Sequence, residues 1–275
     1  MMPPDGHVHI EWSWDTVTGS MEASCRKAIE LGLPSIAFTE HADLTRWTIP
    51  AGTAGILPEH IRPWLRPDGT LQAPDLDVAG YLEAVRRCRD LFPALRIVSG
   101  VELSEPHRHP GRVDALLAAG HFDRVLGSVH ALEGGLPVDV LFDARPQEEI
   151  HREYLAEVLT LVESASPFTV LAHIDYPIRY WSGHYRPSLF EAELREVLGA
   201  LASSGRVLEV NTRVPLHPRV VGWWREAGGS AVSFGSDAHA PMAVGHGFSQ
   251  AAAMVEAQGF RPDRDPHAVW TRRST

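Results

Sequence analysis

Short apolar segments alternate with longer amphipathic segments along the whole chain. Seven of the apolar segments are rich in Val, Ile, Leu and Phe with little alternation, a pattern typical of parallel strands buried on both faces. In the segments between them, apolar residues repeat every three to four positions, which predicts helices with one buried face. The predicted strands are residues 6–10, 34–39, 95–103, 124–130, 169–173, 207–211 and 231–235, and the predicted helices are residues 20–31, 78–91, 110–119, 147–164, 188–202, 218–227 and 243–257.

This alternation of strand and helix predicts an α/β fold. Seven strand–helix units favour a closed or nearly closed parallel barrel, and an open doubly wound sheet is the alternative. The length of 275 residues suits one (β/α) barrel, so we expect a single domain over residues 1–275. Residues 43–74 interrupt the pattern with several prolines and little periodicity. A loop insertion of this kind is either an ordinary surface loop or a lid over a binding site.

Composition and charge exclude several classes of protein. The balance of 25 Lys+Arg against 35 Asp+Glu gives a net charge of −10, which argues against a nucleic acid polymer as partner. No apolar run reaches the roughly 18 residues of a membrane span, so we expect no membrane association. The two cysteines cannot build a disulfide framework, and the start MMPPDGHVHI resembles no secretory signal. We therefore expect a cytoplasmic protein.

Histidines and carboxylates gather at the ends of the predicted strands. Six of the seven strands end in His, Glu or Asp, and active sites of α/β barrels lie at that edge. His7 and His9 alternate in an extended segment, so both rings point to the same side. Each residue alone has an ordinary structural explanation, but the set has the composition of a Zn, Mn or Fe site without thiolates. The strand-end residues are His7, His9, His41, Glu102, His130, His173, Asp237 and His239.

The order of these motifs resembles the polymerase and histidinol phosphatase (PHP) superfamily. The motifs are Asp-x-His-x-His, Thr-Glu-His, Gly-x-Glu, Ser-x-His, Ala-His-x-Asp and Ser-Asp-Ala-His, and they extend from Asp5 to His239. Residues 127–139, 173–175 and 209–212 are most similar to the monofunctional histidinol-phosphate phosphatase branch. The resemblance implies a distorted seven-stranded, TIM-like (β/α)7 barrel with a trinuclear metal site.

The resemblance also implies which residues hold three divalent metal ions. Glu102 would bridge two of the ions. Many relatives have a histidine near position 15, whereas this chain offers Asp15, an adequate oxygen ligand. The first ion would take His7, His9, Glu102 and Asp237, the second Glu102, His130 and His173, and the third His41, His239 and Asp15.

The activity that the resemblance implies is metal-dependent hydrolysis of a phosphomonoester. The expected reaction converts L-histidinol phosphate and water to L-histidinol and phosphate, a step of histidine biosynthesis. A metal-bridged hydroxide beside Glu102 would attack phosphorus, and Asp237 or His239 would assist proton transfer to the leaving alkoxide. Arg179 and Arg213 follow predicted strands and would bind the phosphate.

Other functions remain open from the sequence. A PHP phosphoesterase acting on a nucleotide or another small phosphate ester is the first alternative, and a non-catalytic metal-binding domain is another. Amidohydrolases that need a carboxylated lysine on a middle strand are excluded, because the only lysine is Lys27 on the first predicted helix.

We expect a small phosphomonoester as the partner, and a monomer and a homodimer are both possible. His151, on a polar helix, is expected at the surface.

Overall fold

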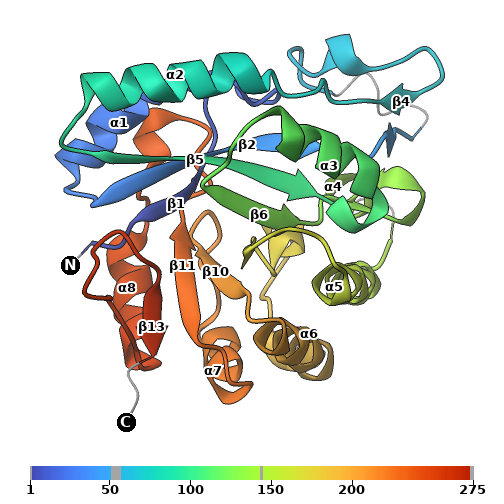
Figure 1. Cartoon of the computed structure of the whole chain (residues 1–275). Helices are drawn as coiled ribbons and strands as arrows, with labels where there is room; N and C mark the ends of the chain where they lie inside the picture. Colours follow the sequence, from blue (N-terminus) through green and yellow to red (C-terminus); the bar gives the residue numbers. More distant parts are fainter. Residues whose placement is uncertain (1, 51–56, 143–144, 273–275) are drawn as a thin grey trace.

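Within the part of the chain that the structure describes, seven parallel strands form the centre of the protein, and helices pack around their outer side (Figure 1). The computed structural model describes residues 2–50, 57–142 and 145–272. Neighbouring strands pair in the order of the chain, as expected for a barrel built from successive strand–helix units. In that order the strands are β1 (Asp5–Val8), β2 (Ser35–Asp43), β5 (Arg96–Ser104), β6 (Arg124–Ser128), β9 (Val170–Leu171), β10 (Val207–Asn211) and β11 (Ala231–Gly235).

The sheet curls until its first and last parallel strands meet. The backbone N–H of His9 donates to the carbonyl of Ala238 at 2.8 Å, and the N–H of Asp237 donates to the carbonyl of His7 at 2.8 Å. These bonds join the end of β1 to the segment that follows β11. The predicted α/β class, a distorted seven-stranded TIM-like barrel, is therefore confirmed.

Two short antiparallel strands extend the sheet beyond β11 and were not predicted. β13 (Trp270–Arg272) pairs with β11, and β12 (Phe260–Arg261) pairs with β13. At two or three residues each, they are too short for an apolar period to reveal them.

Among the described residues, each predicted helix is present close to its predicted position, and α4 (Val138–Phe142) is a further helix that was not predicted. Ser20 and Asp77 cap the first two helices by accepting hydrogen bonds from Ala23 N and Gly80 N. The last helix begins later than predicted, because Gly247 adopts φ 70° and separates it from a 3₁₀ turn. The helices are α1 (Met21–Glu30), α2 (Val78–Leu91), α3 (Pro110–Ala119), α4 (Val138–Phe142), α5 (Gln147–Glu163), α6 (Glu191–Ser203), α7 (Pro218–Glu226) and α8 (Phe248–Ala257).

The insertion at residues 43–74 has a small structure of its own. β3 (Trp47–Thr48) and β4 (Thr70–Leu71) pair antiparallel as a separate two-stranded sheet. Ile49, Ile61 and Leu71 form an apolar cluster apart from the main core. Residues 51–56 of the insertion lie outside the described residues.

The main core lies between the strands and the inner faces of the helices. Tyr81 of α2 is fully buried there, and its hydroxyl donates to Phe38 O at 2.7 Å and accepts from Gly100 N at 2.9 Å. These bonds fix α2 against the centres of β2 and β5, the strands that carry His41 and Glu102 to the rim. Among the described residues, no helix is long and apolar enough to cross a membrane.

Candidate metal centre

The strand-end residues predicted to act together meet at one edge of the barrel. β1 supplies His7 and, just beyond it, His9, and the following strands supply the others in turn. All are buried except His239, whose side chain is 23% exposed. The group comprises His7, His9, His41, Glu102, His130, His173, Asp237 and His239.

The carboxylate of Glu102 lies in the middle of this group. Oε1 is 2.8 Å from His173 Nε2 and 3.5 Å from His130 Nε2. Oε2 faces the other way and lies 3.3 Å from His7 Nε2, 3.5 Å from His9 Nε2 and 3.0 Å from His41 Nδ1. Glu102 can therefore share its two oxygens between two neighbouring sites.

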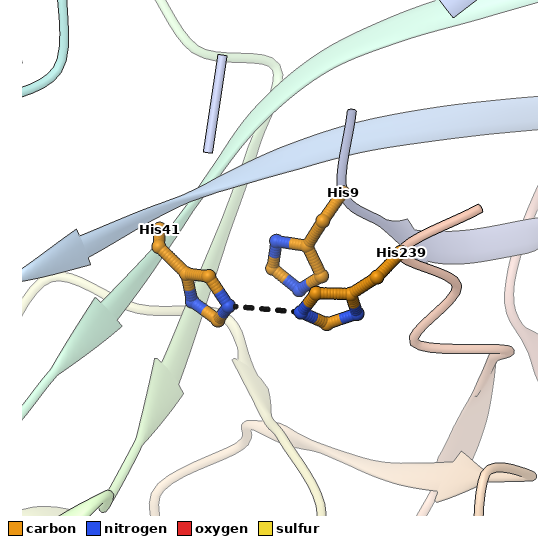
Figure 2. A group of neighbouring side chains, drawn as sticks. All are labelled: His9, His41 and His239. Carbon is orange, nitrogen blue, oxygen red and sulfur yellow. Dashed lines mark hydrogen bonds between the residues drawn. The ribbon is translucent and has the colours of Figure 1, made fainter. Parts of the chain in front are cut away.

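A second set of rings lies towards the mouth of the barrel. Figure 2 shows His9, His41 and His239 turned towards one another, with Nε2 of His41 and Nε2 of His239 3.3 Å apart. Oδ2 of Asp15 is 3.2 Å from His239 Nε2 and 3.4 Å from His41 Nε2. Asp15 thus lies beside the two histidines with which it was grouped, and its role as a ligand stays a prediction.

Asp237 reaches the cluster from a left-handed backbone conformation. Its φ is 52°, which aspartate tolerates better than most residues. Oδ1 lies 3.5 Å from His9 Nε2, and Oδ2 accepts a hydrogen bond from Nη2 of Arg179. The strained turn therefore aims one oxygen at the cluster and the other at a cation.

The cluster fits divalent cations by its excess of acceptor atoms. Nε2 of His7 and Nε2 of His9 are 2.9 Å apart, and the buried Oε2 of Glu102 has no hydrogen-bond donor among the described residues. Acceptors turned towards one another in a buried place repel unless a cation lies between them. Imidazole and carboxylate ligands without sulfur suit Zn, Mn or Fe.

Charges within the cluster shift its pKa values in opposite directions. Burial, together with the neighbouring His41 and His239, lowers the pKa of His9 well below its ordinary range. Burial opposes ionisation of Glu102, but His7 and His130 outweigh it and hold its pKa well below the usual value. Neutral imidazole and ionised carboxylate are the forms that bind metal.

Carboxylates behind two of the histidines were missed by the sequence analysis. Glu209 Oε1 lies 2.7 Å from His7 Nδ1, and Asp43 Oδ1 lies 2.9 Å from His130 Nδ1. Each bond holds a proton on Nδ1 and leaves Nε2 free, as outer partners of metal-binding histidines do. One signal was present, since Glu209 interrupts the apolar strand β10 and a buried charge needs a partner.

A cavity of about 270 Å³ opens onto the cluster. Arg179 and Arg213 lie on its wall, the first with its guanidinium carbon 4.6 Å from the centre of the Tyr176 ring. Arg213 is half-exposed, and its Nη1 is 3.0 Å from Nδ1 of His239. Both predicted phosphate-binding residues therefore face the space beside the cluster. The apolar part of the wall includes Trp14, Trp47, Ile49, Ile61 and Leu71.

His151 is fully buried, so its predicted place at the surface is wrong. Its Nε2 is 3.3 Å from the Tyr185 hydroxyl, and its ring packs edge-on against Phe190 with centroids 4.5 Å apart. Burial lowers its pKa to about 3. The polar pattern of α5 hid this histidine because it lies on the inner face of the helix.

The strands of this parallel barrel end in histidines and carboxylates. This arrangement is typical of proteins that bind metal ions at the rim of a barrel. Comparison with known families narrows this class. The PHP domain matches residues 5–213, which is most of the chain. The chain belongs to the PHP domain family.

Known relatives share most of this chain's length. The histidinol-phosphatase of Lactococcus lactis subsp. lactis (strain IL1403) is 28% identical over 276 residues, covering 93% of this chain and 91% of that protein. The "Probable histidinol-phosphatase" of Deinococcus radiodurans is 28% identical over 280 residues and covers 94% of both. The crystal structure of histidinol phosphate phosphatase from Lactococcus lactis, complexed with Zn, L-histidinol and phosphate, matches with a TM-score of 0.78 at 23% identity, covering 94% of this chain and 95% of that one. That structural likeness shows a shared fold.

Proposed function

We propose that this protein is a metal-dependent phosphatase that hydrolyses L-histidinol phosphate to L-histidinol and phosphate. The observation that carries the proposal is the cluster of buried histidines and carboxylates with two arginines on the same cavity wall. The names of the relatives support this substrate over others. Hydrolysis of a nucleotide or another small phosphate ester is the second candidate, because the same cluster and arginines serve any phosphomonoester.

The cluster divides into three groups of ligands in this proposal. Glu102 is shared by the first two, which its two oxygens and their separate histidine neighbours support. When bound there, divalent ions such as Zn, Mn or Fe supply Lewis-acid chemistry and a water-derived nucleophile near neutral pH. The ligands are His7, His9, Glu102 and Asp237 for the first ion, Glu102, His130 and His173 for the second, and His41, His239 and Asp15 for the third.

Arg179 and Arg213 bind the phosphate dianion and orient it towards the cluster. The Arg179 side chain is only 12% exposed, and it is held by Asp237 on one side and the Tyr176 ring on the other. Its guanidinium has donors to spare for phosphate oxygens. The half-exposed Arg213 gives a second contact from the end of β10.

Proton transfer to the leaving alkoxide belongs to Asp237 or His239. Both line the cavity, and Oδ1 of Asp237 is 3.6 Å from Nδ1 of His239. Glu102 lies deeper and orients the nucleophile by its place between the first two groups. In this arrangement Asp237 and His239 act from the cavity, and Glu102 acts from the buried side of the cluster.

The cavity's size and walls suit a small ring-bearing ester. A space of about 270 Å³ admits a small molecule, and Trp14, Trp47 and Tyr180 offer flat faces for an imidazole.

Cys25 and Cys88 are free and buried, which suits the reducing cytoplasm where we propose that the protein acts.

Phosphate release from a panel of esters tests the proposal. The metal-loaded protein is assayed with L-histidinol phosphate, AMP, p-nitrophenyl phosphate and a phosphodiester. We expect kcat/KM to be at least tenfold higher for L-histidinol phosphate, with loss of activity on chelation and in His130→Ala. The exposed His121, replaced by Ala, is the matched control and should keep full activity. A preference for AMP would favour the second candidate, and no hydrolysis of any monoester would refute both.

A further inference from the structure

A line of hydrogen bonds ends on His9 and involves two side chains outside the proposed ligand set. The Ser13 hydroxyl lies 2.7 Å from Glu40 Oε2, and Nδ1 of His9 lies 3.2 Å from Ser13 Oγ. Ser13 is 4% exposed and Glu40 is fully buried. Neither lines the cavity beside the cluster, so any effect on the reaction must pass through the residues that they contact.

The turn after β1 fixes the directions in which Ser13 can bond. Its N–H donates to Ile10 O at 3.0 Å, and its Oγ accepts from the backbone N–H of His41 at 3.1 Å. A hydroxyl has one hydrogen and two acceptor positions. The hydrogen goes to Glu40 and one acceptor position is taken by His41, so the remaining acceptor position faces His9.

Glu40 can only accept through the oxygen that faces Ser13. Oε2 also accepts from the backbone N–H of Ile10 at 3.3 Å, whereas Oε1 has no partner among the described residues. Burial raises the pKa of Glu40 to about 8, against the lowering effect of the bonds from Ser13 and Ile10. A proton on the carboxyl belongs on the free Oε1, so Oε2 remains an acceptor in both states.

We propose that Glu40 and Ser13 are positioning residues for His9, holding its ring with a proton on Nδ1 and a lone pair on Nε2. The inference rests on the proposed function, because His9 is one of the ligands assigned there. Nε2 is the atom that faces His7 Nε2 at 2.9 Å and Asp237 Oδ1 at 3.5 Å. The Glu40–Ser13 pair thus does for His9 what Glu209 and Asp43 do directly for His7 and His130.

The first test determines the tautomer of His9 in the wild-type protein. The ¹⁵N shifts of the histidine rings in the folded full-length protein report which nitrogen of His9 carries the proton, with His9→Gln identifying its signals. We expect the proton on Nδ1. A proton on Nε2 in the wild-type protein would overturn the proposal.

The second test compares Zn²⁺ affinity in matched serine variants. Ser13→Ala removes the acceptor for His9, and with it the acceptor for the backbone N–H of His41, and we expect about 10- to 100-fold weaker Zn²⁺ binding. Ser24→Ala is the control, because Ser24 is also a buried serine and its hydroxyl has no partner among the described residues. It should bind Zn²⁺ within twofold of wild type.

The third test asks whether Glu40 acts through Ser13. Glu40→Met keeps the size but removes the acceptor, so the Ser13 hydroxyl can donate to His9 Nδ1 and reverse the tautomer. We expect Zn²⁺ affinity to fall in Glu40→Met and to recover in Glu40→Gln, which keeps an acceptor oxygen. In the Ser13→Ala background, Glu40→Met should cause no further loss.

The outcomes separate this inference from the proposed function. Wild-type Zn²⁺ affinity in Ser13→Ala, with His9→Ala impaired, would overturn the positioning role alone. Wild-type Zn²⁺ affinity in His9→Ala would overturn the ligand role of His9 and the positioning role with it. Additive losses in the double variant would show that Glu40 does not act through Ser13.

Discussion

Replacing Glu209 by Gln removes a charge behind the metal centre without changing the shape of the side chain. Glu209 accepts three hydrogen bonds, from His7 Nδ1 at 2.7 Å, His173 N at 2.9 Å and Asn211 Nδ2 at 3.0 Å. The first falls on Oε1 and the other two on Oε2. An amide offers a single acceptor oxygen, so Glu209→Gln leaves at least one donor unmatched.

The expected magnitude follows from which donor loses its partner. If the amide nitrogen replaced Oε2, two buried donors would be stranded at about 1–3 kcal/mol each. We therefore expect the amide nitrogen to take the place of Oε1, beside His7 Nδ1. Only one pair of donors then opposes each other, the amide N–H and the Nδ1–H of His7. His7 then moves its proton to Nε2, the nitrogen that faces Glu102. We expect Zn²⁺ affinity to fall about 10- to 100-fold, or about 1.4–2.7 kcal/mol.

Zn²⁺ affinity is measured by competition with a fluorescent chelator, and thermal unfolding of the metal-free protein is followed in parallel. The exposed Glu163, replaced by Gln, serves as the matched control on α5 and should change neither quantity. A Glu209→Gln protein that binds Zn²⁺ within threefold of wild type would refute the reasoning that this carboxylate sets the protonation of His7.

Three further predictions follow from single features of the structure. Arg213→Ala should raise KM for phosphomonoesters with little change in kcat, because Arg213 is a half-exposed contact at the cavity wall, and unchanged steady-state kinetics would remove it from the site. Gly235→Ala should weaken metal binding, because a Cβ there would meet the Glu209 carboxylate and lie 2.6 Å from Cβ of His7, and a metal titration equal to wild type would contradict this. His151 takes up a proton on unfolding wherever the pH lies between its folded pKa of about 3 and its ordinary 6.5, so stability is lost as pH falls through this window. Between pH 7 and pH 5 the loss attributable to His151 is about 2 kcal/mol, and His151→Phe should abolish that part in chemical unfolding curves; equal pH slopes in the two proteins would count against it.

The strands and helices were predictable because the signals that define them are local. Buried parallel strands leave largely apolar runs, as in β11, and capped amphipathic helices leave a clear period, as in α2. β12 and β13 were missed because they are two or three residues long and depend on pairing with each other and, for β13, with β11.

The members of the candidate site were predictable for a different reason. Strand ends of a parallel barrel meet at one rim, so residues as distant as His7 and His239 are brought together by topology alone. The hydrogen bonds behind the cluster could not be predicted from topology in this way. Glu40 is adjacent to His41 in sequence, but its bond reaches Ser13, and only the fold of the turn after β1 determines that contact.

His151 shows the limit of reading polarity along a helix. Its neighbours on α5 are charged, yet the histidine points inwards, where Phe190 and Tyr185 enclose it. Tyr185 and Phe190 lie more than thirty positions away in the chain, so no pattern within α5 reveals that they accept a histidine there.

Titration of the metal-free protein with Zn²⁺ or Mn²⁺, with bound metal and L-histidinol phosphate hydrolysis measured on the same samples, tests the central claim most directly. Elemental analysis gives the ions per chain, and released phosphate gives the rate. We predict no turnover in the metal-free protein, a rise with added metal, and a plateau at about three ions per chain, as three groups of ligands imply. Full activity without bound metal, or saturation with metal and no hydrolysis, would contradict the account.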